Sequence, residues 1–202
     1  MSAANQGEAG ALTRGMTGLS RSFYEVACQF TTQMAAGEKV QAISYPSAVV
    51  ILTVACLEAY LNEFLSLRRL MEPDKWGSPS SRLSRRLEER WLEAPRIFSG
   101  NTFDKGREPF QSFHSLVCLR NNLIHYDAQF RTRKEFPSGV IKQLKSKFAF
   151  AYEGNADWTS QVLNLECSRW ACRTTKAMVK RFHEFVGGVD LSNFPYPWPD
   201  PL

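Results

Sequence analysis

Apolar residues recur at helical spacing along most of the chain and predict an all-α protein. The first helical segment spans about residues 18–36 and stops at Gly37. The second spans about residues 46–71 and is apolar almost all round, which is typical of a buried central helix. Long helices with short breaks and no convincing strand pattern indicate a helical bundle of four to five main helices.

Three further segments follow in the second half of the chain. A strongly charged run at about residues 81–93 predicts a solvated surface helix, and an irregular stretch is expected over residues 95–108. A fourth helix is predicted over about residues 109–126 and a last one over about residues 158–186. Residues 140–152 leave a short helix and a strand open, and we favour the helix.

The helical pattern divides the chain into three parts. Residues 1–17 are small and polar and predict a flexible N-terminus. Residues 18–188 form the predicted bundle, and the proline-rich residues 189–202 predict an extended tail.

Composition narrows the class of protein. The chain has 202 residues, 44% of them hydrophobic and 22% charged, which is ordinary for a globular domain. The most apolar run, residues 48–61, is interrupted by Glu58 and too short for a bilayer, and the N-terminus lacks signal-peptide features. We therefore expect a cytoplasmic protein with no membrane partner.

Cofactor and metal chemistry find little support in the sequence. The five cysteines have no zinc-ligand spacing and are expected to be buried thiols in a reducing compartment. No glycine-rich phosphate loop or metal-binding histidine pair is present, so no cofactor and no metal are expected. A net charge of +5 fits an anionic partner such as RNA, although many basic proteins bind none.

One run, from Arg120 to His125 (RNNLIH), carries chemical content. At about 100° per residue, Arg120 falls in the middle of the apolar arc of its helix. An unpaired guanidinium in that position would lower the stability of the fold by roughly several kcal/mol. We therefore expect Arg120 to have a partner of opposite charge. Glu58, the only charge between Pro46 and Asn62 on the central helix, is the predicted partner, and Asn62 lies one turn beyond it.

These residue types suit the cleavage of single-stranded RNA without a metal. His125 can deprotonate a 2′-hydroxyl, because an ordinary imidazole titrates near neutral pH. Arg120 can stabilise the charge that builds up on the phosphate. Asn121, four residues before His125, shares its face and could orient the phosphate or the imidazole.

Residues 119–126 (LRNNLIHY) resemble the Arg-polar-x-x-x-His motif of the HEPN superfamily (higher eukaryotes and prokaryotes nucleotide-binding). Residues 55–64 (ACLEAYLNEF) resemble the central helix of several HEPN groups, which bears a Glu and an Asn. The resemblance implies a dimer whose two motifs form one cleft for single-stranded RNA. It also implies a metal-independent endoribonuclease, such as a toxin with an antitoxin partner or a defence effector.

The resemblance is incomplete around Tyr126. One toxin subgroup carries a modified tyrosine two residues after the motif histidine, where this chain has Asp127, while Tyr126 adjoins His125 directly. Tyr126 is therefore placed only as a supporting residue, with Glu58 and Asn62.

Simpler interpretations remain open for each feature. His125 could interact only with the helix dipole, and the basic cluster at residues 82–90 could be a solvated face or could bind RNA phosphates. The alternative function is a non-catalytic, dimeric HEPN-like module that binds a partner protein or a nucleotide.

Overall fold

The computed structural model describes residues 18–37, 44–71, 83–125, 143–148 and 158–186. These residues form six helices and contain no strand, so the predicted all-α class is confirmed. The helices are α2 (Leu19–Ala35), α3 (Ser44–Met71), α4 (Leu87–Ser99), α5 (Phe110–Ile124), α7 (Trp158–Val162) and α8 (Leu165–Phe185). The predicted terminal segments and Tyr126 lie outside the described residues.

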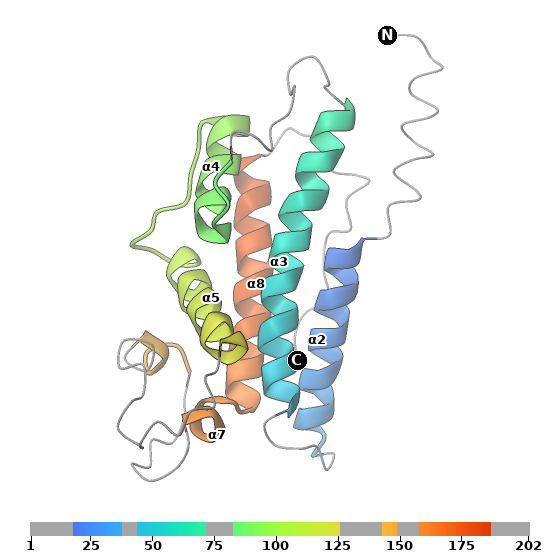
Figure 1. Ribbon diagram of the computed structural model, residues 1–202, viewed down its shortest axis with the longest axis vertical. Coiled ribbons are helices and arrows are strands. Elements are labelled where there is room, and N and C mark those ends of the chain that lie inside the picture. Colours follow the sequence, from blue (N-terminus) through green and yellow to red (C-terminus); the bar gives the residue numbers. More distant parts are fainter. Residues whose placement is uncertain (1–17, 38–43, 72–82, 126–142, 149–157, 187–202) are drawn as a thin grey trace.

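Helix α3 is the centre of the bundle, as its all-round apolar pattern predicts. It packs against α2, α8 and α5, and Figure 1 shows it with α2 on one side and with α4 and α5 on the other. Its buried side includes Val54, Leu57, Leu61 and Phe64. By length and composition this helix could also cross a membrane, but a mostly buried core helix passes the same test, and 56% of its most apolar window is buried here.

Aromatic side chains join α3, α4 and α8 in the core. The ring of Phe182 on α8 meets the edges of Phe64 and Trp91 at centroid distances of 4.8 and 5.4 Å, and Tyr60 stacks on Trp91 at 6.0 Å. Edge-to-face pairs of this kind add to the stabilisation from burial alone. The packing fixes the tilt of α4 relative to α3 and α8.

Helix α4 departs from its predicted limits. It was expected at about residues 81–93, but it begins at Leu87, runs through Pro95 and ends at Ser99, where Gly100 adopts a left-handed conformation with φ of 76°. A proline inside a helix loses one hydrogen bond, which argued for a stop before Pro95. Burial of Trp91, Leu92, Ala94 and Pro95 on one face outweighs that loss. The helix predicted to lie on the surface therefore buries one of its faces in the core.

The last predicted helix is broken into two. Helix α7 ends at Val162, and Asn164 begins α8 by accepting a hydrogen bond from the Cys167 amide at 2.9 Å. An Asn cap satisfies an amide at a helix start that would otherwise lack a partner. Within residues 143–148 the chain makes a single helical turn, closed by a bond from the Lys147 amide to the Leu144 carbonyl at 2.8 Å. This agrees with the favoured helix over the part that is described, while residues 140–142 and 149–152 lie outside the described residues.

All five cysteines are free. Cys56, Cys167 and Cys172 are buried, and Cys28 and Cys118 are half-buried, which fits the expectation of buried thiols for three of the five.

Candidate functional site

Helix α5 carries the predicted motif at its C-terminal end. Its buried residues Phe113, Leu116, Val117 and Leu119 hold it against α3 and α8. Beyond Leu119 the helix runs out of the core, since Ile124 is 52% exposed. The motif therefore lies where a helix emerges from the packed interior.

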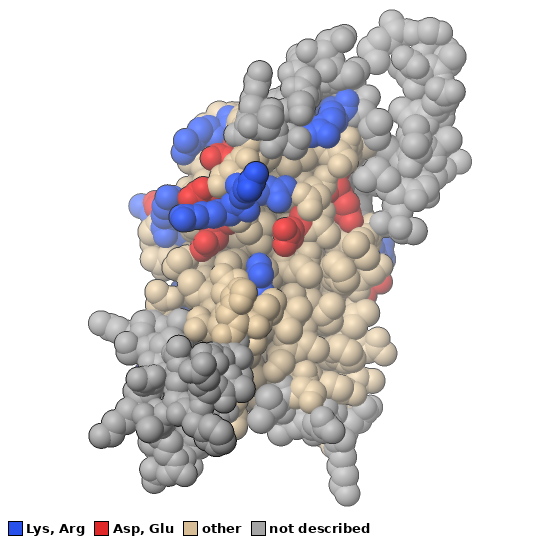
Figure 2. Space-filling model, in the orientation of Figure 1, with Lys and Arg blue, Asp and Glu red and all other residues tan. Residues whose placement is uncertain are grey.

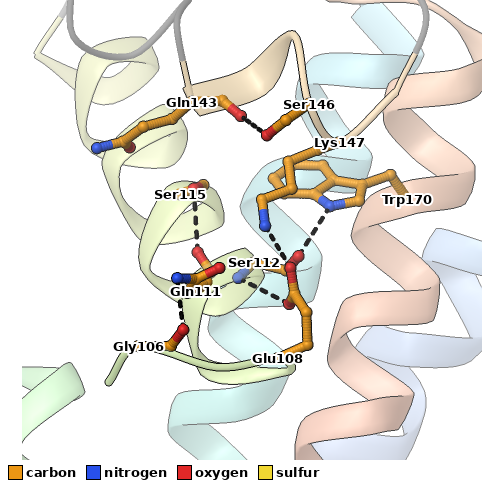
Figure 3. A network of polar contacts seen from close by, with 9 residues as sticks. All are labelled: Gly106, Glu108, Gln111, Ser112, Ser115, Gln143, Ser146, Lys147 and Trp170. Carbon is orange, nitrogen blue, oxygen red and sulfur yellow. Dashed lines mark hydrogen bonds and ion pairs between the residues drawn. The ribbon is translucent and has the colours of Figure 1, made fainter. Parts of the chain in front are cut away.

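The start of α5 is fixed by a polar network at the opposite end from the motif (Figure 3). The Glu108 carboxylate accepts a hydrogen bond from the Ser112 amide at 3.1 Å and pairs with the ammonium group of Lys147. Although partial burial opposes it, the hydrogen bond from Lys147 and those from Ser112 lower the pKa of Glu108. The network ties residues 143–148 to α5 and sets the position of the helix.

Arg120, which the helical wheel placed in the middle of the apolar arc, is only half-buried, and no ion pair neutralises it among the described residues. Its Nε atom is fully shielded from solvent and has no hydrogen-bond partner among the described residues. A buried N–H without an acceptor costs about 1–3 kcal/mol, so this guanidinium is poised to gain a partner. An anion that reaches the end of α5 would supply one.

Asn121 and His125 are exposed one turn apart on the last turn of α5. The His125 amide donates to the Asn121 carbonyl at 2.9 Å, and His125 ends the helix as its C-cap. Among the described residues no hydrogen bond or ion pair joins the side chains of Arg120, Asn121 and His125. The structure brings the three residues onto one helix end without linking them.

The predicted ion pair between Glu58 and Arg120 is wrong. Glu58 is exposed, and no ion pair links it to Arg120 in the described part of the chain. Glu58 lies on the solvent side of α3, in a stripe at helical spacing that also holds Ile51, Asn62 and Ser66. The core takes up the opposite arc of α3, so Glu58 stays in solvent.

Asn62 has a different partner from the one expected. Its Oδ1 accepts a hydrogen bond from the Nη2 of Arg90 on α4. This contact joins α3 to α4 at the surface, at one edge of a cleft of about 490 Å³. Glu58 and Asn62 therefore share a face of α3, but the structure assigns a contact only to Asn62.

A second cluster, at positions where the sequence predicted no site, lies on the flank of α5. The Nδ1 of His114 pairs with the Glu88 carboxylate on α4, and the Nε2 of the same ring lies 3.8 Å from the Sγ of Cys118. The spacing of four residues between His114 and Cys118 was the available signal in the sequence. Glu88 and His114 also line a cleft of about 560 Å³.

The order of thiol, imidazole and carboxylate resembles that of a nucleophilic triad. Burial and the nearby charge of Glu88 raise the pKa of Cys118, which keeps the thiol protonated at neutral pH. Since the thiolate is the reactive form, we assign this cluster the role of joining α4 to α5.

The described residues contain no group of three or more His, Cys, Asp and Glu side chains arranged to hold a metal ion. Comparisons with protein-family models, with curated proteins and with solved structures found no match to this chain.

Proposed function

We propose that the chain is a metal-independent endoribonuclease of the HEPN type, acting on single-stranded RNA. The observation that carries the proposal is the state of Arg120, a half-buried guanidinium whose shielded Nε lacks a partner, beside an exposed His125. The reaction needs a permanent cation and an accessible imidazole, and Arg120 has no counter-ion among the described residues.

In the proposed reaction His125 takes the proton of the 2′-hydroxyl. The 2′-oxygen then attacks the adjacent phosphorus, the bond to the 5′-oxygen breaks, and the products carry a 2′,3′-cyclic phosphate and a 5′-hydroxyl. Arg120 stabilises the added negative charge on the phosphate, and the Asn121 amide orients it. The leaving 5′-oxygen needs a proton, which a second imidazole would donate.

That second imidazole is our reason to propose a two-fold dimer. His125 of the partner subunit would face the first across a shared cleft. Ile124 and Ile51 support such a contact, because both are large apolar side chains exposed on α5 and α3, with exposed fractions of 52% and 38%. We place this dimer in the cytoplasm, with an antitoxin protein as a further partner.

The proposal is tested with purified protein and a labelled single-stranded RNA in EDTA. The wild type should cleave it and leave 2′,3′-cyclic phosphate ends, whereas His125→Ala should be inactive with an unchanged fold because the residue is exposed. His114→Ala is the matched control, since it removes another exposed imidazole from the same helix and should leave cleavage intact. A requirement for magnesium, or full activity in His125→Ala, would contradict the mechanism.

The second candidate function is a non-catalytic module that binds a protein or nucleotide. It is favoured by the absence of any side-chain contact among Arg120, Asn121 and His125 in the described structure. On an ideal helix Arg120 and His125 point about 140° apart, so one subunit alone does not aim both at a single phosphate. Binding without cleavage by the dimer would favour this module.

A further inference from the structure

Three arginines from two parts of the chain line the cleft that also contains Asn62. Arg69 lies near the end of α3, Arg85 lies in the segment before α4, and Arg90 lies in the first half of α4. The other lining residues are neutral: Asn62, Leu65, Ser66, Leu83 and Ser84. The cleft measures about 490 Å³, and among the residues that the structure describes no carboxylate contributes to its lining.

Within the described part of the chain, no ion pair compensates the charge of this arginine cleft (the residues just named). Arg69 and Arg85 are exposed and make no ion pair in the described part of the chain. Arg90 gives a hydrogen bond to Asn62, which is a neutral acceptor. Three guanidinium groups therefore line one cleft, and none has a counter-ion among the described residues.

Two acidic side chains of α4, Glu89 and Glu93, are hydrogen-bonded to Ser84. The Glu93 carboxylate accepts a hydrogen bond from the Ser84 amide at 2.8 Å, and Glu89 accepts one from the Ser84 hydroxyl. Glu89 also lies 3.5 Å from the guanidinium of Arg86. These contacts hold the segment before α4 in place, so they fix Arg85 beside the cleft.

The cleft lies on the face of α3 that leads to the motif. Arg69, Ser66, Asn62 and Glu58 follow one another at helical spacing on the exposed side of α3. In Figure 1, α4 lies beside the upper half of α3 and α5 beside its lower half. Figure 2 shows lysines and arginines over the upper part of this face, with acidic side chains among them, while uncharged side chains fill much of the lower part.

We propose that the arginine cleft binds the phosphate backbone of a single-stranded polynucleotide and holds it on the α3 surface, away from the linkage that is cut. Forked guanidinium groups match phosphate oxygens, and Leu65 and Leu83 give the cleft an apolar part on which a sugar or base can rest. The choice of a polynucleotide as the ligand rests on the proposed function. The unpaired arginines of the cleft are a feature of the structure and are independent of that function.

Binding is measured separately from cleavage. The His125→Ala protein is titrated in EDTA with a labelled single-stranded RNA and with a DNA of the same sequence, which has no 2′-hydroxyl to attack, and fluorescence anisotropy gives Kd. Replacing Arg69 and Arg85 together by glutamine should raise Kd about tenfold for both strands, since lost phosphate contacts weaken binding to every sequence. The dependence of log Kd on log salt should fall by about 1.4, the value for two phosphate contacts on a single strand.

Two controls make the result specific. Arg173→Gln with Arg181→Gln removes the same charge from exposed positions on α8 and should leave Kd unchanged within about twofold, because only local contacts survive screening at physiological salt. Asn62→Asp should weaken binding while retaining the fold, since a carboxylate would neutralise Arg90. Equal Kd values for the cleft and α8 double variants would overturn the proposal. Equally tight, arginine-dependent binding of poly-glutamate would also overturn it, because the cleft would then recognise charge alone.

Failure of this inference is distinguishable from failure of the proposed function. If the wild type cleaves RNA and the cleft variants match it in KM, the cleft proposal falls and the ribonuclease stands. If no RNA is cut but strand binding depends on Arg69 and Arg85, the ribonuclease falls and the cleft stands. With both correct, the cleft variants raise KM and leave kcat at saturating RNA unchanged.

Discussion

The carboxylate of Glu63 on α3 accepts two hydrogen bonds from Ser20 on the first turn of α2, one from the amide at 3.0 Å and one from the hydroxyl at 2.6 Å. Amides in the first turn of a helix have no partner within the helix, and the positive end of the helix dipole favours a negative charge there. Glu63 therefore does for α2 what a capping residue would do, while Glu58 on the same helix stays in solvent.

This difference between the two glutamates predicts their effects on stability. Glu63→Ala should lower the free energy of unfolding by about 1–2 kcal/mol, because the α2 amide and the buried Ser20 hydroxyl lose their acceptor. Glu58→Ala should change it by less than about 0.5 kcal/mol, as for other exposed positions. Urea unfolding followed by circular dichroism measures both, and equal losses would contradict the assignment.

Replacing Arg120 should separate stability from activity. Arg120→Met keeps most of the side-chain volume and removes the shielded Nε that lacks a partner. The free energy of unfolding should therefore rise by about 1 kcal/mol. The same variant should lose RNA cleavage, because methionine carries no charge. The reference is Arg173→Met on the exposed side of α8, and a destabilised Arg120→Met protein would show that the guanidinium has a structural partner.

Because α4 continues through Pro95 with one face buried, its residues should differ in how much they contribute to stability. Trp91→Ala should cost about 3–5 kcal/mol, since the ring is fully buried against Tyr60, Phe113 and Phe182. Ile97→Ala, on the last turn of the same helix, should cost less than about 1 kcal/mol because its side chain is 44% exposed. Thermal unfolding of the two variants tests this, and the reverse order would place α4 with its other face inward.

His183 should make stability depend on pH. Burial lowers its pKa from 6.5 to about 4, and its ring is hydrogen-bonded to the Tyr60 hydroxyl. The unfolded chain therefore binds the proton first, so this contribution is complete above about pH 6.5 and is lost as the pH falls towards 4. Between pH 7.5 and 5 the loss should be about 1–2 kcal/mol, because a half-buried imidazole keeps part of its hydration. Urea unfolding of His183→Gln should show a smaller loss over the same range.

The helices that follow from a local pattern of apolar residues could be predicted from the sequence alone. The apolar spacing of α2, α3 and α5 predicted their limits to within a few residues, because a helix buries one stripe and its period is visible in the sequence. The position of His125 at the end of its helix follows from the same geometry, whereas Arg120 is less buried than its place in the apolar arc predicted.

Which helices meet, and which side chains pair across them, depends on the packing of the whole fold. Glu58 and Glu63 look alike in the sequence, yet only Glu63 faces the start of α2. The packing of Trp91 carried α4 past Pro95, although local propensity argued for a stop. The Arg90–Asn62 contact and the arginine cleft join segments far apart in the chain. Their existence depends on the tilt and rotation of α4 against α3, which are set by the shape of the whole core and leave no periodic trace in the sequence.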